Sequence, residues 1–363
     1  MSKITKNIQM VDLHGQYMKI KDEVDKSMQE VLNNTAFIKG PAVKAFESQL
    51  AEYCEANYVV SCANGTDALQ IALMSLDLNP GDEVILPVFT YVATAEVIAL
   101  LRLKPVFIDV DAETFNINIE AVESKITDKT KAIVPVHLFG QVAEMEGLLA
   151  LAKKYDLKII EDAAQAIGAE YTFSNGSKRQ AGTIGDIGTT SFFPSKNLGC
   201  FGDGGALYTN NESLSEKCRM IANHGQQEKY YHDIVGVNSR LDSIQAAILS
   251  VKLGHLKAYT ESRQAVAAYY DKELSDLDYI STPYITSNST HVYHQYTLKL
   301  KDVDRDELKK YLADNGIPSM VYYPVPLHFQ KAYNHISSES FPVAELLSKT
   351  VLSLPIHTEM DQE

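Results

Sequence analysis

Short apolar runs alternate with amphipathic segments over the first two thirds of the chain. The apolar runs are rich in β-formers, end in small or polar residues, and cover residues 58–61, 83–87, 105–109, 132–136, 158–162 and 189–193. Helical periods between them cover residues 66–76, 94–101, 119–125 and 145–155. Continuous apolar strands that alternate with helices predict a mostly parallel sheet with helices on both faces, which is an α/β fold.

The pattern changes after about residue 241. A long helix is predicted over residues 242–274, followed by a segment rich in Thr, Ser, Pro and Asn over 281–290. A strand at 296–300 and a helix at 305–315 come next, and Asn-Gly-Ile-Pro stops that helix. We therefore expect a large domain with an N-terminal arm over residues 1–250 and a smaller C-terminal α+β domain over residues 251–363.

Several polar residues follow the predicted strands directly. Ligands of parallel sheets collect at the carboxyl ends of the strands, so Gly65, Thr66, Tyr91 and Asp162 are predicted to converge. Gly65 and Thr66, at the start of a helix, offer backbone N–H groups and a hydroxyl to an anion. The alternative is a simple Asn-Gly turn with Thr66 as the helix N-cap.

Composition limits the partners. The 363 residues are 45% hydrophobic, and 33 basic against 47 acidic residues give a net charge of −14. Such a chain lacks the basic surface that nucleic acids and anionic membranes require. The four cysteines form no Cys-x-x-Cys pair, so no metal site is expected, and the N-terminus has no apolar signal segment. We expect a cytoplasmic protein with free thiols.

Lys196 and Asp162 are the strongest candidates for chemistry. Lys196 follows a predicted strand and is flanked by Phe193, Pro194 and Leu198, an apolar setting that lowers a lysine pKa. An amine nucleophile and a strand-end carboxylate are what a pyridoxal phosphate enzyme needs, because the lysine forms the Schiff base and the carboxylate keeps a proton on the pyridine nitrogen. The alternatives are a surface lysine and an exposed carboxylate.

Two further polar segments are candidates for substrate contacts. His224 lies in a polar, aromatic region, and Asn238 and Arg240 precede the long predicted helix. The alternative for the second segment is a capping loop in which Ser239 or Asp242 caps the helix.

These pieces, in this order, resemble the DegT-type sugar aminotransferases, which are pyridoxal phosphate enzymes of fold type I. The resemblance runs from Val11 to His357 and is carried by the following segments: NGTDAL, FTYVATAE, EDAAQ, SFFPSKNLGCFGDGGA, HGQ, VGVNSRLDSIQAAIL and YYPVPLH. Similar chains are expected to continue past the LPIH segment into a final helix, which the printed sequence, ending at Glu363, does not include.

The resemblance implies a role for each candidate. Lys196 binds the cofactor and moves the proton, Asp162 pairs with the pyridinium nitrogen, and Gln165 lies near the phenolic oxygen. Asn238 reaches across a homodimer interface to the partner's cofactor phosphate. The remaining candidates hold the phosphate (Gly65, Thr66, Ser191), stack on the ring (Tyr91) or face the substrate (His224, Arg240, Tyr322, Tyr323).

The reaction implied is transfer of an amino group from L-glutamate to a 3-keto sugar, with pyridoxamine phosphate as the carrier. The segments SFFPSKNLGC, VGVNSRLD and YPVPLH favour UDP-2-acetamido-2-deoxy-3-oxo-glucuronate, in O-antigen assembly. Alternatives are a dTDP-3-keto-6-deoxyhexose aminotransferase, an enzyme of free amino acids, a non-catalytic regulator, and a sugar dehydratase. Members of the dehydratase branch carry histidine at the lysine position, and Lys196 argues against that branch.

Overall fold

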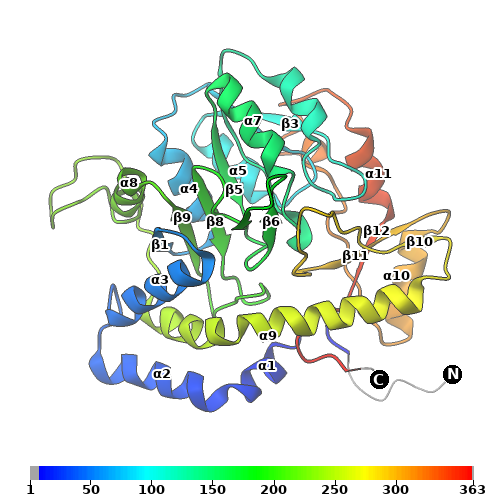
Figure 1. Cartoon of the computed structure of the whole chain (residues 1–363), viewed down its shortest axis with the longest axis horizontal. Coiled ribbons are helices and arrows are strands. Elements are labelled where there is room, and N and C mark those ends of the chain that lie inside the picture. Colours follow the sequence, from blue (N-terminus) through cyan, green and yellow to red (C-terminus); the bar gives the residue numbers. More distant parts are fainter. Residues whose placement is uncertain (1–7, 362–363) are drawn as a thin grey trace.

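A seven-stranded sheet forms the centre of the computed structural model, which describes residues 8–361 (Figure 1). Its order is β1 (Tyr58–Cys62), β9 (Gly205–Thr209), β8 (Ile187–Ser191), β5 (Lys158–Asp162), β4 (Thr130–Ile133), β2 (Glu83–Pro87) and β3 (Lys104–Ile108). Only β9 runs antiparallel to its neighbours, and the other pairs are parallel. The predicted mostly parallel sheet is confirmed.

Helices cover both faces of this sheet because successive strand residues point to opposite sides. In β2, Val84 and Leu86 belong to one core cluster and Ile85 belongs to another. The first face is covered by α4 (Gly65–Ser75), α5 (Ala93–Leu100) and α8 (Glu212–Ala222). The opposite face is covered by α3 (Pro41–Cys54), α6 (Ile119–Val122), α7 (Met145–Tyr155) and the first half of α9 (Ser243–Leu274).

The helix α9 is the longest element and runs along one side of the molecule, from the central sheet to a second, smaller sheet (Figure 1). The smaller sheet is antiparallel, with order β10 (Ile280–Ser281), β11 (Tyr296–Leu300) and β12 (Val351–Leu354). With α10 (Arg305–Asp314) it forms the predicted smaller α+β unit. The boundary expected at residue 250 falls within α9, and the division into two domains stays a prediction.

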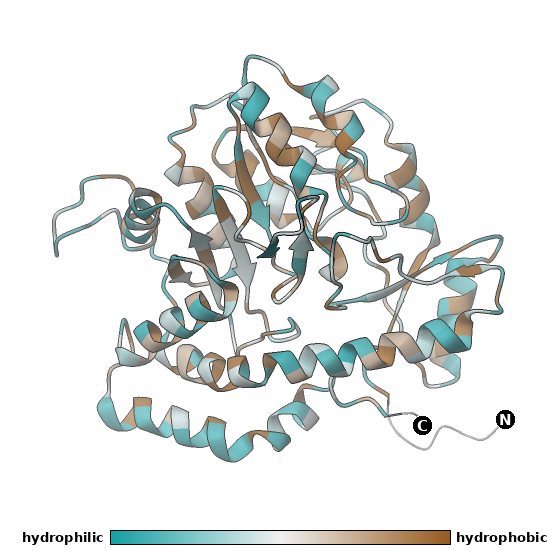
Figure 2. Cartoon of the chain, viewed as in Figure 1, coloured by the Kyte–Doolittle hydropathy of each residue, from teal (hydrophilic) through white to brown (hydrophobic). Residues whose placement is uncertain are grey.

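The remaining elements are short or peripheral. Two helices, α1 (Leu13–Lys19) and α2 (Lys21–Asn34), form the arm, and α2 is largely hydrophilic in Figure 2. The hairpin β6 (Glu170–Thr172) and β7 (Lys178–Gln180), the helix α11 (Pro342–Thr350) and three 3₁₀ turns, η1 (Glu123–Lys125), η2 (Leu138–Gly140) and η3 (Leu327–Phe329), complete the list. Within residues 8–361, no helix combines the length and apolar character needed to cross a bilayer.

The side chains named as alternative helix caps, those of Thr66, Ser239 and Asp242, make no capping hydrogen bond. Asn64, not Thr66, caps α4, because its side chain accepts a hydrogen bond from the backbone N–H of Asp67 at 2.8 Å. The side chain of Asp242 makes no capping bond at α9, and the hydroxyl of Ser239 instead accepts from the N–H of Ala63 at 3.0 Å. The segment before α9 is therefore tied to the end of β1.

Candidate active site

The carboxyl ends of β1, β5 and β8 meet at one edge of the central sheet. Asp162 is the last residue of β5, Ser191 is the last residue of β8, and α4 begins at Gly65 just after β1. β1 and β8 point the same way because each pairs antiparallel with β9 between them. The topology thus brings together the strand-end residues that the sequence singled out.

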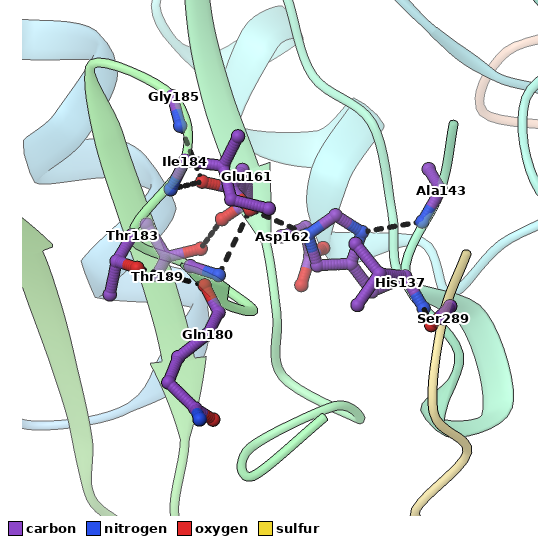
Figure 3. Close-up of polar contacts among 12 residues, drawn as sticks. His137, Ala143, Glu161, Asp162, Gln180, Thr183, Ile184, Gly185, Thr189 and Ser289 are labelled. Atoms are coloured by element: carbon purple, nitrogen blue, oxygen red, sulfur yellow. Dashed lines mark hydrogen bonds and ion pairs between the residues drawn. The ribbon is translucent and has the colours of Figure 1, made fainter. Parts of the chain in front are cut away.

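Asp162 is a buried carboxylate, 6% exposed, without an ion-pair partner in residues 8–361. Its Oδ2 accepts a hydrogen bond from Thr94 Oγ1 at 2.8 Å, and its Oδ1 accepts from the N–H of Ala164 at 3.2 Å. In Figure 3, Asp162 lies next to Glu161. The residues that bond to the side chain of Glu161 are on the other face of β5. A buried carboxylate held by two neutral donors is suited to a cationic N–H partner.

Lys196 lies in the turn after β8 and is half-buried. Burial lowers the pKa of this amine to about 8, and the charge of Asp162 works against that shift by raising it. Its backbone N–H donates to the carbonyl of Phe193 at 2.8 Å, and the next side chain, Asn197, donates to the carbonyl of Val292 at 2.9 Å. More of this amine is therefore neutral near pH 7 than in an exposed lysine, which is the direction that the apolar flanking residues predicted.

Gln165 connects Asp162's loop to two aromatic residues. Its Oε1 accepts from the N–H of Phe139 at 2.7 Å, and its Nε2 donates to the hydroxyl of Tyr323 at 3.1 Å. Burial raises the pKa of Tyr323 well above its ordinary value. The rings of Tyr323 and Tyr91 are 6.3 Å apart, and Tyr322 packs against Tyr323 at 6.0 Å. The structure thus brings four predicted site residues together: Gln165, Tyr91, Tyr322 and Tyr323.

The N-terminus of α4 supplies the anion-binding features. A Cβ added to Gly65 would lie 2.6 Å from the Cβ of Ser191, so only glycine allows the helix to start against the end of β8. In the described part of the chain, the Thr66 hydroxyl makes no hydrogen bond, because Asn64 takes the capping role. The free N–H groups at this helix start, the hydroxyls of Thr66 and Ser191, and the helix dipole are suited to binding a phosphate.

Three predicted site residues lie on a different segment of the chain. His224, Asn238 and Arg240 are on the segment after α8, where His224 donates its N–H to the carbonyl of Val237 at 2.9 Å. No hydrogen bond or ion pair within residues 8–361 joins them to Lys196 or Asp162. Arg240 borders a cavity of about 200 Å³ whose lining also includes Lys39, Lys44, Glu47 and Arg219.

Sequence reasoning missed two residues of the site. Thr94 looks like an ordinary residue of a helix start, yet it holds one oxygen of Asp162. His294 is buried, and burial together with the positive charges of Lys196 and Arg263 holds its pKa well below the ordinary value. Neither has a sequence signal, since both depend on contacts between segments far apart in the chain.

A sheet of this topology, with a lysine of lowered pKa and a buried carboxylate at its edge, is the arrangement that a pyridoxal phosphate enzyme of fold type I needs. Comparison with known proteins shows to which family within this class the chain belongs. The chain belongs to the DegT/DnrJ/EryC1/StrS aminotransferase family, whose model matches residues 18–363, and it is an aminotransferase.

Curated relatives cover nearly the whole chain. A "Pleiotropic regulatory protein" of Geobacillus stearothermophilus is 47% identical over 98% of this chain and 95% of the relative. The UDP-2-acetamido-2-deoxy-3-oxo-D-glucuronate aminotransferase of Pseudomonas aeruginosa is 46% identical over 98% and 96%. The dTDP-3-amino-3,6-dideoxy-alpha-D-galactopyranose transaminase of Aneurinibacillus thermoaerophilus is 42% identical over 98% and 96%.

Solved structures confirm the fold. DesV of S. venezuelae superimposes with a TM-score of 0.94 at 39% identity, covering 99% of this chain and 95% of that one. NtdA of Bacillus subtilis, solved with the cofactor pyridoxamine phosphate, superimposes with a TM-score of 0.89 at 32% identity, covering 100% and 82%. The residues described above fit this cofactor, because Asp162 lacks a cation and Gly65 leaves room beside Ser191.

Proposed function

We propose that this aminotransferase uses pyridoxal phosphate to move an amino group from L-glutamate to the 3-keto group of a nucleotide-linked sugar. The sugar that we favour is UDP-2-acetamido-2-deoxy-3-oxo-glucuronate. The observation that carries the proposal is the buried carboxylate of Asp162 together with Lys196, whose pKa burial lowers to about 8 and the charge of Asp162 raises. The P. aeruginosa relative, 46% identical, acts on that sugar according to its name.

Each site residue then has a defined task. When bound, pyridoxal phosphate supplies an electron sink for the negative charge that develops at the substrate carbon. Asp162 holds a proton on the ring nitrogen, and Thr94 fixes one oxygen of that carboxylate. The Nζ of Lys196 moves the proton, which its lowered pKa allows near neutral pH. Gln165, held by Phe139 and Tyr323, would contact the phenolic oxygen of the cofactor.

The binding residues divide into two groups. Gly65, Thr66 and Ser191 receive the phosphate, and the exposed ring of Tyr91 stacks on the cofactor. His224, Tyr322 and Tyr323 face the substrate.

A cationic cavity supports an acidic sugar as substrate. Lys39, Lys44, Arg219 and Arg240 line it, against the single carboxylate of Glu47. Arg219 already pairs with Glu47 at 3.1 Å, and the pKa of Lys39 is lowered by burial and by the charges of Arg240 and Arg219. The cavity therefore has an excess of positive charge, and we assign Arg240 to the carboxylate of the uronate.

The same cavity supports a site shared by two subunits. Within residues 8–361, Asn238 and Arg240 make no hydrogen bond or ion pair with Lys196 or Asp162, and the cavity that Arg240 borders is not lined by either of those two residues. Aromatic residues near the site are also exposed, with 58% of Tyr91 and 53% of Phe193 accessible in the single chain. We propose a homodimer in which each subunit completes the other's site.

One other substrate class has direct support. The A. thermoaerophilus relative, 42% identical, is named as a dTDP-3-amino-3,6-dideoxy-alpha-D-galactopyranose transaminase, which favours a dTDP-3-keto-6-deoxyhexose. The regulatory name of the G. stearothermophilus relative favours a non-catalytic regulator instead. The presence of Lys196, Asp162 and Gln165 together argues against a regulator that has lost its chemistry.

The deciding experiment is the visible spectrum of the purified protein, reconstituted with pyridoxal phosphate. We expect L-glutamate to convert the cofactor band to that of pyridoxamine phosphate, and UDP-2-acetamido-2-deoxy-3-oxo-glucuronate to restore it. Lys196→Ala is expected to abolish the cycle. A band that glutamate leaves unchanged would refute the proposed donor, and restoration by the dTDP sugar alone would favour the second substrate class.

Arg240→Ala tests the sugar. We expect its KM for the uronate to rise about tenfold or more because a charge-assisted contact is lost, while KM for glutamate stays within about twofold. Arg179→Ala, which removes an exposed arginine of the β6–β7 hairpin, is the matched control and should change neither value. Equal KM values for Arg240→Ala and the wild type would reject the assignment.

A further inference from the structure

A buried polar network lies behind Asp162, on the opposite face of β5 (Figure 3). At its centre is Glu161, whose side chain is fully buried. Its Oε1 accepts from the N–H groups of Ile184 and Gly185, both at 2.6 Å, and its Oε2 accepts from the N–H of Gly182 at 2.9 Å. Such a carboxylate is costly to bury and is retained only where several donors satisfy it.

The fourth donor is His137, whose Nε2 lies 2.8 Å from Glu161 Oε2. The contacts of the ring settle its tautomer. His137 Nδ1 accepts the backbone N–H of Ala143 at 3.2 Å, so the ring proton is on Nε2 and is donated to Glu161. The ring is therefore a neutral bridge with both nitrogens used, and Glu161 is the only charge in the pair.

The pair joins three segments that reach the active-site edge. Glu161 belongs to β5, His137 to the turn after β4, and Gly182, Ile184 and Gly185 to the loop before β8. The turn after β4 also forms hydrogen bonds with two site residues. The N–H of His137 donates to the carbonyl of Asp162 at 3.0 Å, and the N–H of Phe139 donates to Gln165 Oε1 at 2.7 Å.

The backbone around the pair leaves little freedom for it to adjust. Phe139 and Gly140 have positive φ values of 59° and 114°, and a Cβ on Gly140 would lie 2.9 Å from the backbone nitrogen of Tyr293. Gly182 has φ of 87°, and a Cβ there would lie 2.9 Å from the ring of Tyr208. A change in the length or charge of either bridging side chain is therefore transmitted to the turn and to the end of β5.

We propose that His137 and Glu161 are a positioning pair, which holds Asp162 and Gln165 at the height and angle that the cofactor ring requires. Neither residue touches the reacting atoms. The inference rests on the ring-nitrogen role proposed for Asp162, and it adds two residues to the determinants of the reaction.

Glu83 provides a matched control for a purely structural contribution. It is also a buried glutamate of the central sheet, 5% exposed, and it accepts hydrogen bonds from Lys104 Nζ at 2.9 Å and Thr127 Oγ1 at 2.6 Å. It is the first residue of β2, at the amino end of the strand, away from the active-site edge. Glu83→Gln and Glu161→Gln should both lower the melting temperature of the apo-protein.

The test compares Glu161→Gln, Glu83→Gln and Asp162→Asn in the reconstituted protein. The readouts are the Kd for pyridoxal phosphate and the ¹⁵N chemical shift of the ring nitrogen in labelled cofactor. We expect Glu161→Gln to weaken cofactor binding about tenfold, to move the ring-nitrogen signal toward that of Asp162→Asn, and to lower kcat about 10- to 100-fold, the size of effect seen for residues that orient ligands. Glu83→Gln should change none of these.

A second pair of variants covers a Glu161→Gln protein that fails to fold. His137→Leu removes the donor and should reproduce the cofactor effects, whereas His137→Gln keeps an N–H that reaches Glu161 and should recover most of the binding and the ring signal. Normal cofactor binding and an unshifted ring signal in Glu161→Gln or His137→Leu, with a shifted signal in Asp162→Asn, would overturn the positioning pair alone. An unshifted signal in Asp162→Asn would overturn the role of Asp162 and the pair together.

Discussion

At the residue scale, Lys196 is subject to two opposing effects. Burial lowers the pKa of its amine to about 8, and the nearby carboxylate of Asp162 raises it. His294, whose pKa is held low by burial and by the same lysine, stays neutral and adds no charge to the site. The amine therefore loses its proton within about one pH unit of neutrality, whereas an exposed lysine does so near pH 10.4.

This balance predicts a pH profile. The rate at which the apo-protein takes up pyridoxal phosphate should rise with pH and level off above about pH 8, because only the neutral amine attacks the cofactor aldehyde. Asp162→Asn should move the midpoint to lower pH, because it removes the charge that raises the pKa. Stopped-flow absorbance between pH 6 and about pH 10 measures both profiles. A rate independent of pH, or a midpoint that moves upward in Asp162→Asn, would contradict this account.

At the scale of single residues, the sequence predicted the candidate catalytic side chains that follow the strands. It did not predict the side chains that hold those residues in place. Lys196 and Asp162 carry local signals, namely an apolar frame and a position at the end of an apolar run. Thr94 and His137 have none, because their roles arise from hydrogen bonds to Asp162 and Glu161, which lie 68 and 24 residues away in the chain.

At the element scale, buried strands and long amphipathic helices were predictable from the sequence. The predicted bounds of β2, β5, α7 and β11 agree with the structure, and α9 differs by one residue at its start. The apolar signal was clear there because these elements are bounded by turn residues or charges. β8 begins two residues earlier than predicted, since its Ile-Gly-Thr-Thr-Ser sequence is weakly apolar.

Elements with mixed patterns escaped prediction. β9 follows a glycine-rich turn and itself begins with Gly205, so only four of its residues carry a strand signal. α8 is buried only at Ser215, Cys218, Ile221 and Ala222, a narrow face with a polar start. The strand β10 has two residues and depends on pairing with β11. Tertiary contacts, rather than local preference, decide such elements.

At the scale of the whole molecule, the proposed sharing of each active site between two subunits predicts complementation between inactive variants. In a shared site, one chain supplies Lys196 and the partner supplies Asn238. Mixing Lys196→Ala with Asn238→Ala, after reversible dissociation, should restore about a quarter of the wild-type turnover, because half of the dimers are mixed and each has one intact site.

The controls for this experiment follow from the same geometry. Each variant alone, and a mixture of Lys196→Ala with Asp162→Asn, should stay inactive, because Lys196 and Asp162 belong to one chain and one site. Sedimentation analysis of the mixture establishes that mixed dimers have formed. Mixed dimers without regained turnover would show that Asn238 does not act across the interface.

The helix α9 also affects how the molecule can move and unfold. Its 32 residues extend about 48 Å and contribute Leu249, Leu253 and Leu256 to the core beside the central sheet and Ala267 to the core of the small sheet. Arg263, between these regions, donates hydrogen bonds to the carbonyls of Tyr293 and Ile356 at 3.0 and 2.9 Å. A rigid rod shared by two cores leaves no hinge between them, so the two parts should melt as one cooperative unit, and access to the active site has to be controlled by loops.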